Sequence, residues 1–296
     1  MYSITYSMTD YTNCDIIVEK DKLAFIEEFN IMDGVNKTLY IPLYGKSYVS
    51  KKGIILKDEK AEEIWEKEQF KLKGKSKSKW LAYYMGIRGS VFDKWLEEQM
   101  IINQEAVVIH IGCGMDSRVH RVGTNNHNWY DVDFPEVITE RKKYYIEDEY
   151  YKMVDGDARE LDWLTRIPFS KHAIVVLEGI SMYLNNSELK VLLSNISNHF
   201  ESVNLLMDCY SIFAAKISKY KNPINDVGVT KVFGLDNPET VATNSFLFKM
   251  EHVMIPAKYV EELHGLEKFI FKKLYAGNFS KKLYKLFEFE KPMNKN

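Results

Sequence analysis

Glycines and acidic residues follow several short apolar runs in the middle of the chain, and these residue types could together bind a polar organic ligand. One apolar run leads into Gly112 and Gly114, and three later runs end close to Asp133, Asp157 and Glu178. If the runs are parallel strands of one sheet, their carboxyl ends meet at one edge, where such sheets bind ligands. The spacing therefore predicts a site made of glycine backbone and carboxylates.

The glycine pair limits the kind of ligand. The apolar run Ala106–Ile111 is a strand candidate, and glycines directly after it allow a tight turn and a close backbone approach to a ligand. A dinucleotide site would need a third glycine where Ser117 stands, and the carboxylate of Asp116 would repel a pyrophosphate. These features count against NAD and favour S-adenosylmethionine, a sulfonium without phosphate.

The acidic residues have the positions expected for nucleoside contacts, although each has a simpler interpretation. Asp131 and Asp133 alternate along a strand, so one is expected at the ribose while the other caps or supports the turn. Asp157 could accept a hydrogen bond from the adenine amino group, or it could only form an Asp-Gly turn. Glu178 ends an apolar strand and needs a partner, which is either the ligand or a structural Arg or Lys.

Two unlike stretches make up the chain. Residues 1–104 are predicted to form a helical N-terminal cap, and residues 105–296 an α/β domain with a lid-like insertion around 210–245. The β-α-β alternation predicts a Rossmann-like, doubly wound, mostly parallel sheet with helices on both faces. The expected helices are Asp21–Phe29, Lys57–Phe70, Val91–Ile101, Glu136–Glu149 and Asn186–Phe200. The expected strands are Ala106–Ile111, His127–Asp133, Tyr151–Val154, Ala173–Leu177 and Val203–Met207, with Phe246–Val253 and Glu267–Ala276 as possible closing strands.

Composition excludes several other classes of protein. The 296 residues carry a formal net charge of −2, without the basic excess typical of nucleic-acid binding. No run approaches the roughly 18 apolar residues of a membrane span, and the N-terminus does not read as a signal peptide. Three widely spaced cysteines indicate neither disulfides nor a metal site, so a cytoplasmic protein is expected. The lysine-rich segment 71–79 is either an anion-attracting loop or a solvated one.

Taken in order, four of these segments resemble the leucine carboxyl methyltransferase family, including the tetracenomycin-type polyketide O-methyltransferases. Two N-terminal segments, residues 38–44 and 88–93, are also similar to the family, and the resemblance covers about residues 36–210. It implies a class I S-adenosylmethionine-dependent methyltransferase with a seven-stranded sheet. The four segments are Ile109–Arg118, Tyr130–Val137, Asp155–Arg159 and Leu177–Leu184.

The resemblance also implies a role for each matching residue. Glycines and Glu178 would lie at the methionine part of the cofactor, and Arg88 would face its carboxylate, where a bidentate guanidinium is suited. Two positions depart from the common pattern: Cys113 is interpreted as packing, and His110 as a core histidine. For Arg88 a surface ion pair, and for the cap lysine a solvated side chain, stay open as alternatives. The implied cofactor-binding residues are Lys46 (with Lys37 behind it), Arg88, Gly112, Gly114, Asp133, Asp157, Ala158 and Glu178.

The expected activity is methyl transfer to a carboxylate or hydroxyl oxygen of a small molecule, with S-adenosylhomocysteine as product. A carboxylate is ionised at neutral pH and needs no general base, whereas a hydroxyl does. The scattered histidines favour the carboxylate, and Tyr183 is expected either to orient the acceptor or to be a core aromatic. The alternatives are a nicotinamide-dependent oxidoreductase and a catalytically silent methyltransferase-like binding protein. The identity of the acceptor and the oligomeric state are left open.

Overall fold

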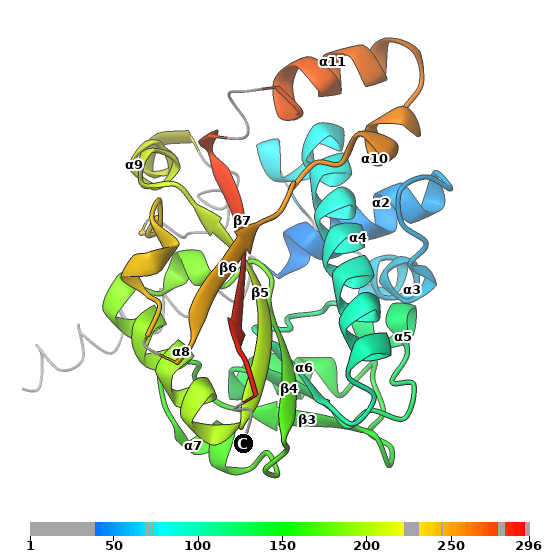
Figure 1. Cartoon of the computed structure of the whole chain (residues 1–296). Coiled ribbons are helices and arrows are strands. Elements are labelled where there is room, and N and C mark those ends of the chain that lie inside the picture. The colour runs from blue at the N-terminus through cyan, green and yellow to red at the C-terminus, as the bar shows by residue number, and fades with distance from the viewer. Residues whose placement is uncertain are drawn as a thin grey trace, which may run out of the picture.

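A single mixed sheet organises the protein in the computed structural model (Figure 1), which describes residues 39–68, 72, 74–221, 231–243, 245–277 and 282–293. Within these residues the sheet has seven strands in the order β3-β2-β1-β4-β5-β7-β6. The first five strands are parallel, and β7 runs antiparallel to both β5 and β6. The strands are β1 (Val107–Ile111), β2 (Trp129–Asp133), β3 (Tyr151–Asp155), β4 (His172–Leu177), β5 (Ser202–Tyr210), β6 (Leu247–Glu251) and β7 (Tyr284–Lys291).

The order of the strands reverses between β1 and β4, and this places the ligand site. From β1 the chain adds β2 and β3 on one side, then returns to add β4 and β5 on the other. A doubly wound sheet opens a crevice at such a reversal, at the carboxyl ends of its strands. Both faces of β1 and β4 are covered, so these strands are almost continuously apolar and β-branched.

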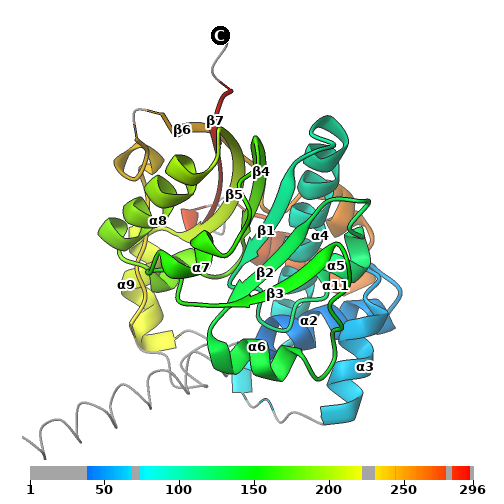
Figure 2. The ribbon, with the colours of Figure 1, turned by 90° about the horizontal axis from the view of Figure 1, so that it is seen from below.

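Helices cover both faces of the sheet, as Figure 2 shows. On one face, α4 packs Phe92, Trp95 and Leu96 into a core shared with β1, β2 and β4. On the other face, α7 and α8 pack against the opposite side of the same strands. The helices are α2 (Tyr40–Lys51), α3 (Glu59–Glu68), α4 (Lys79–Ile102), α5 (Arg118–Val122), α6 (Pro135–Arg141), α7 (Asp162–Thr165), α8 (Asn186–His199), α9 (Ile212–Lys221), α10 (Ala257–Glu261) and α11 (Gly265–Tyr275).

The structure confirms the predicted fold class and corrects several predicted elements. Of residues 267–276, expected as a closing strand, 267–275 lie in α11, because their apolar residues recur at helical spacing; the closing strand is β7. The helix expected at 91–101 is the second half of the 24-residue α4. The helix expected at 136–149 ends at Arg141, and the predicted strand at 246–253 is confirmed as β6.

Other predictions on organisation are met only in part. The predicted helix Asp21–Phe29 lies outside the described residues, as do 222–230 within the proposed lid. The segment 210–245 begins with α9, and the lysine-rich segment contains a short 3-10 turn at Gly74–Lys77. Because α4 shares one core with the sheet, a boundary at residue 104 stays a prediction. Within the described residues no helix combines the length and apolar character needed to cross a bilayer.

Glycines allow α2 and α4 to approach each other closely, and this contact carries a lysine towards the sheet. A Cβ atom on Gly45 would lie 2.6 Å from Cβ of Met85, and one on Gly86 would lie 2.6 Å from a methyl of Val49. A Cβ on Gly89 would lie 2.9 Å from Cε of Lys46. The absence of side chains at these positions therefore lets the Lys46 side chain cross α4.

We expect Gly45→Ala to destabilise the protein by roughly 1–3 kcal/mol, because the new methyl must push apart two helices whose nearest atoms are close to the backbone. This exceeds the gain of about 1 kcal/mol that alanine brings to a helix interior. Urea unfolding followed by circular dichroism measures the change. Lys51→Ala, at an exposed site on the same helix, is the control and should stay within about 0.5 kcal/mol. A Gly45→Ala variant as stable as the control would contradict the tight contact.

Candidate functional site

The glycine turn after β1 has the backbone conformation that its sequence predicts. Gly112 and Gly114 have φ values of +69° and +51°, which residues with a side chain rarely adopt. A Cβ on Gly112 would also lie 2.9 Å from the side chain of Ile180. The backbone N–H of Gly112 donates to Val132 O over 2.8 Å, which ties the turn to β2. The turn is thus held with bare backbone at the carboxyl ends of β1 and β4.

Asp133 lies at the end of β2 and faces this turn. One carboxylate oxygen accepts the N–H of Gly114 over 2.7 Å, and the other accepts the N–H of Phe134 over 2.8 Å. Each oxygen keeps a lone pair, so the carboxylate could still accept hydrogen bonds from ribose hydroxyls. Burial raises the pKa of Asp133 to about 6, against the two backbone donors, which lower it. The structure thus places Asp133 where the prediction requires it, and the ribose contact stays a prediction.

Asp131, the alternate acid, has a structural role. It is fully buried and accepts hydrogen bonds from Trp129 Nε1 (2.8 Å) and the Tyr151 hydroxyl (2.8 Å). It also forms an ion pair with Arg141. The same guanidinium donates to the carbonyl oxygen of Gly114 over 3.0 Å. Asp131 therefore supports the glycine turn through Arg141. Of the two acids, Asp133 alone lies at the strand end.

Glu178, directly after β4, is the meeting point of three cations from three helices. Arg88 of α4 donates to it from Nε over 2.9 Å, Lys46 of α2 lies 3.3 Å away, and Arg118 of α5 completes the group. Burial by itself raises the pKa of Glu178, but the three cations outweigh it and hold the pKa well below its usual range. The alternative of a structural partner is confirmed: Glu178 is ion-paired within the protein. Lys46 is buried rather than solvated.

Arg88 is the cation with donors left over. It is 3% exposed, so the predicted alternative of a surface ion pair is wrong; its pairs are buried. Nη1 lies 3.2 Å from Asp208 and 3.5 Å from the Tyr284 hydroxyl, whereas Nη2 donates to none of the described residues. Nη2 also lies 3.3 Å from the position that a Cβ on Gly179 would take. A buried guanidinium with one unused nitrogen is a receptor for a carboxylate.

Asp208 and Tyr284 are functional candidates that the sequence reasoning missed. Asp208 is fully buried in β5 and accepts the N–H of Gly179 over 2.6 Å as well as Arg88. Burial raises its pKa, although Arg88 lowers it. An acid within the otherwise apolar run 205–209 was the available signal, by the same reasoning that singled out Glu178. Tyr284 gave no signal, because its place depends on an antiparallel strand pairing.

Asp116 extends the ion network around Glu178, because Lys46 and Arg118 pair with both acids, and this weakens the predicted repulsion of a pyrophosphate. Its carboxylate pairs with Lys46 (2.8 Å) and Arg121 (2.7 Å), so its charge is compensated within the protein. The repulsion of a pyrophosphate by Asp116 is therefore smaller than a bare carboxylate would cause. Ser117 is buried and donates to Asp58, which leaves no glycine-like approach for a phosphate at this position. Ser117 is therefore the residue that disfavours a dinucleotide at this turn.

The predicted adenine contacts follow β3. Asp157 accepts hydrogen bonds from the N–H of Arg159 (2.9 Å) and from its guanidinium (2.9 Å to Oδ2). Ala158 is half-buried beside the core on that face of the sheet. Gly156 between the strand and Asp157 leaves no room for a side chain, since a Cβ would lie 2.5 Å from Trp163. Both residues lie at the correct edge of the sheet, and their contact with adenine stays a prediction.

The remaining predicted residues divide into core and site. His110 is buried in β1, with Arg118 Nη1 3.0 Å from its Nε2, and burial together with Arg118 lowers its pKa; it is a core histidine as expected. Cys113 is buried, and burial raises the pKa of its thiol, consistent with packing. Tyr183 ends a short 3-10 turn after β4, packed beside Tyr210, and its role towards an acceptor stays a prediction. Lys37 lies outside the described residues.

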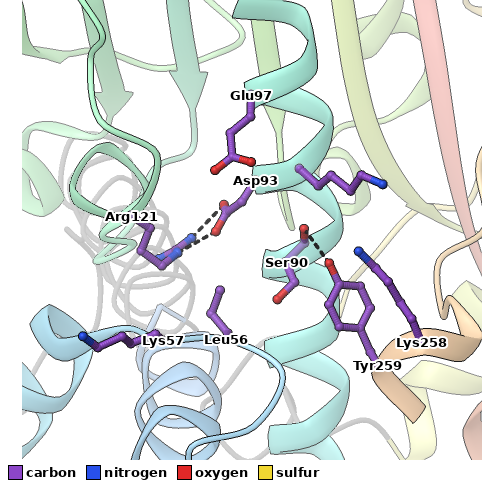
Figure 3. Close-up of a pocket in the computed structure, with 9 residues that line it drawn as sticks. Leu56, Lys57, Ser90, Asp93, Glu97, Arg121, Lys258 and Tyr259 are labelled. Atoms are coloured by element: carbon purple, nitrogen blue, oxygen red, sulfur yellow. Dashed lines mark hydrogen bonds and ion pairs between the residues drawn. The ribbon is translucent and has the colours of Figure 1, made fainter. Parts of the chain in front are cut away.

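A separate cavity of about 410 Å³ opens on the outer side of α4 (Figure 3). Asp93 and Arg121 form part of its wall and point toward each other, joined by ion pairs. Lys94, Lys258 and Glu97 also line it. This cavity therefore lies behind the ion network, and the residues predicted to bind the cofactor do not line it. The described His, Cys, Asp and Glu side chains form no group of three or more that could hold a metal ion.

We expect Glu178→Gln to lower the free energy of unfolding by about 3–5 kcal/mol, because it leaves three cations without their shared buried counter-charge. Chemical unfolding in urea measures the loss. Glu98→Gln, which breaks an exposed ion pair with Lys94 on α4, is the control and should change stability by less than about 0.5 kcal/mol. If both variants lost the same small amount, the ion network would not hold the elements together.

Comparison with known proteins agrees with this geometry. "Tetracenomycin polyketide synthesis O-methyltransferase TcmP" of Streptomyces glaucescens is 27% identical over 186 residues, covering 62% of this chain and 69% of that protein. "S-adenosyl-L-methionine-dependent methyltransferase dpfgK" of Gibberella zeae is 27% identical over 187 residues, covering 57% of this chain and 62% of that protein. The matches thus span about two thirds of the length of these relatives.

A solved structure and a family model complete the comparison. The crystal structure of a DUF574 family protein from Streptomyces avermitilis matches with a TM-score of 0.53 at 8% identity, over 79% of this chain and 90% of that chain. At this identity the match supports the fold alone. The model of the leucine carboxyl methyltransferase family matches residues 38–197, more than half of the chain. The chain therefore belongs to the leucine carboxyl methyltransferase family of S-adenosylmethionine-dependent enzymes.

Proposed function

We propose that this protein transfers a methyl group from S-adenosylmethionine to a carboxylate oxygen of a small molecule. The observation that carries the choice of a carboxylate is the state of the basic groups at the site. Asp208 accepts hydrogen bonds on both oxygens, Glu178 is held by three cations, and His110 is enclosed in β1. These three groups, on β5, β4 and β1, are thus engaged within the protein, and the other acids at the strand ends, Asp133 and Asp157, are assigned to the ribose and the adenine. A carboxylate acceptor requires no such base.

The residues present fit the cofactor part by part. The lone pairs of Asp133 suit ribose hydroxyls, and the bare backbone of Gly112 and Gly114 allows a close approach. Glu178 offers negative charge for the ammonium group, and Nη2 of Arg88 offers donors for the carboxylate. When bound, S-adenosylmethionine supplies a methyl group on a positively charged sulfur. This assignment gives both the ammonium and the carboxylate of the cofactor an opposite charge nearby.

Lys46 adapts the site to the arrival of a fourth positive charge at Glu178. Lys46 and Arg88 both contact Oε1 of Glu178, and Lys46 has a second partner in Asp116 at 2.8 Å. We infer that Lys46 can remain on Asp116 when the cofactor ammonium competes for Glu178. Arg88 remains fixed through Asp208 at the same time. The protein therefore keeps its buried charges paired in both situations.

The contribution of these residues to the reaction is alignment. The ion pairs anchor the methionine end of the cofactor on β4 and α4, while Asp133 anchors the ribose on β2. Holding two reactants in a reactive arrangement can lower a barrier by roughly 7–11 kcal/mol without any proton transfer. Two relatives support a methyl-transfer reaction by their names, and the Streptomyces glaucescens protein is named an O-methyltransferase.

Methyl transfer to a carboxylate is tested with S-adenosylmethionine carrying a labelled methyl group and matched pairs of carboxylic acids and phenols. We expect labelled esters, which release labelled methanol in alkali, whereas ethers do not. Arg88→Lys should weaken S-adenosylmethionine affinity by about tenfold or more, because lysine lacks the planar fork. Lys94→Gln, exposed on the same helix, should bind as the wild type does. Label only in alkali-stable ethers would contradict the carboxylate, and no turnover on any acid or phenol would contradict the activity.

The raised pKa of Asp133 predicts a pH dependence of product binding. With a pKa of about 6 the carboxylate is mostly ionised at pH 7 and mostly protonated at pH 5. The affinity for S-adenosylhomocysteine should therefore fall about tenfold between pH 7 and pH 5, measured by isothermal titration calorimetry. Asp133→Asn should bind S-adenosylhomocysteine more weakly at pH 7, and its affinity should not change between pH 7 and pH 5. An Asp133→Asn variant that keeps the wild-type pH dependence of binding would show that another group is responsible.

The same group has the opposite effect on the free protein. An unfolded aspartate titrates near 3.8, so the folded chain holds this proton more tightly than the unfolded chain does. The contribution of Asp133 to the free energy of unfolding therefore falls as the pH rises from about 4 to about 6.

A further inference from the structure

The hydroxyl of Tyr84 is buried without a hydrogen-bond partner among the described residues, although the residue is only 7% exposed. Folded proteins rarely leave such a donor unpaired, so each case needs an explanation. Ring nitrogens of Trp95, Trp163 and His172 are also unpaired. What distinguishes Tyr84 is its position on α4, four residues before Arg88 and therefore on the same helix face.

Two further tyrosines surround this position. The ring of Tyr84 lies 5.4 Å from that of Tyr284, and Tyr284 lies 4.8 Å from Tyr210, both in edge-to-face arrangements. Tyr210 ends β5 and Tyr284 begins β7, and the two are register partners in the sheet. Figure 1 shows these two strands side by side. The three rings thus form an aromatic wall beside Arg88, at the carboxyl end of β5.

The order of the strands places this wall on the acceptor side of the cofactor. Asp157 and Asp133 follow β3 and β2, the glycine turn follows β1, and Glu178 follows β4. A cofactor held by these residues extends from its adenine over β3 to its methionine end over β4. The next strands in the sheet are β5 and β7, which carry Tyr210 and Tyr284. An acceptor approaching from the side away from the adenosine therefore meets these tyrosines.

The chemistry of Tyr84 suits an anionic oxygen. Burial raises the pKa of its hydroxyl well above the usual range, while Arg88 lowers it, so the group stays a protonated donor at neutral pH. The guanidinium of Arg88 lies on the same helix face, but Glu178 and Asp208 already compensate its charge, so the hydroxyl of Tyr84, and not the guanidinium, is the donor offered to the acceptor. Edge-to-face rings beside the hydroxyl favour a flat, apolar partner.

We propose that Tyr84 is an acceptor-binding residue, whose hydroxyl donates a hydrogen bond to the carboxylate of an aromatic acid lying against Tyr210 and Tyr284. The proposal rests on the proposed function and names its substrate class. It also predicts opposite effects on stability and binding, because a donor that waits for its ligand contributes nothing favourable to the free protein.

Tyr83 on the same helix provides a matched control. Its hydroxyl donates to Glu267 over 2.6 Å and lies 2.7 Å from Lys52 Nζ, so it is satisfied within the protein. Tyr83→Phe should therefore lower the melting temperature and leave ligand binding unchanged. Tyr84→Phe should keep or raise the melting temperature, because it removes an unpaired buried hydroxyl.

Binding is measured by calorimetry on the complex with S-adenosylhomocysteine, with 1-naphthoate, decanoate and 1-naphthol as probes. We expect 1-naphthoate to bind more tightly than the other two, and Tyr84→Phe to weaken it about tenfold, as loss of a hydrogen bond to a charged group does. Affinity for S-adenosylhomocysteine itself should stay unchanged in Tyr84→Phe and Tyr83→Phe.

Each of the other outcomes contradicts one part of the proposal. If the wild type does not bind S-adenosylhomocysteine, the proposed function fails before this inference is reached. If it binds S-adenosylhomocysteine but not 1-naphthoate, or binds decanoate as well, the aromatic acid is the wrong class. If Tyr84→Phe binds 1-naphthoate as the wild type does, or melts as early as Tyr83→Phe, the hydroxyl has a structural role and the inference is wrong.

Discussion

The structure depends on one buried carboxylate. Glu178 follows the central strand β4 and collects Lys46 from α2, Arg88 from α4 and Arg118 from α5. Removing one partner of a buried ion pair costs far more than forming the pair contributes, so such a group fixes elements relative to one another. Three helices are thereby held at the carboxyl end of β4.

The same group ties the helical segment before the sheet to the proposed binding site. Lys46 reaches Glu178 only because Gly45, Gly86 and Gly89 let α2 lie close against α4. Arg88 is then held by Asp208 on β5 as well as by Glu178 on β4, so its remaining nitrogen has a defined position. Packing between two helices thus determines the electrostatics at the edge of the sheet.

The two sides of the sheet carry different kinds of residue at the strand ends. The strands on the β3 side present acids and glycines, which suit the sugar, base and charged groups of a cofactor. The strands on the β7 side present Tyr210 and Tyr284, with Tyr84 of α4 beside them. The antiparallel β7 inserts the last part of the chain between β5 and β6 and brings Tyr284 to the guanidinium of Arg88.

The sequence by itself determined the parallel half of the fold and the edge of the sheet at which we propose that a ligand binds. Strands such as β1 and β4 are covered on both faces, so their continuously apolar sequence predicts them. The glycines with positive φ come directly after β1 in the sequence. Short-range rules also indicated Asp133 and Glu178, because an acid after an apolar strand needs a nearby partner. Composition and spacing are local properties, and these features follow from local rules.

Only the tertiary structure decided which charges meet. Asp131 and Asp133 are two residues apart and identical in type, yet one is enclosed by Trp129, Tyr151 and Arg141 while the other lies at the strand end. Asp116 was interpreted as a free charge, but Lys46, 70 positions earlier in the chain, and Arg121 compensate it. Tyr284 reaches Arg88 through strand pairing across the sheet. Such contacts join residues far apart in the chain, and no local pattern encodes the partner, because Coulombic pairing and burial depend on distances in space.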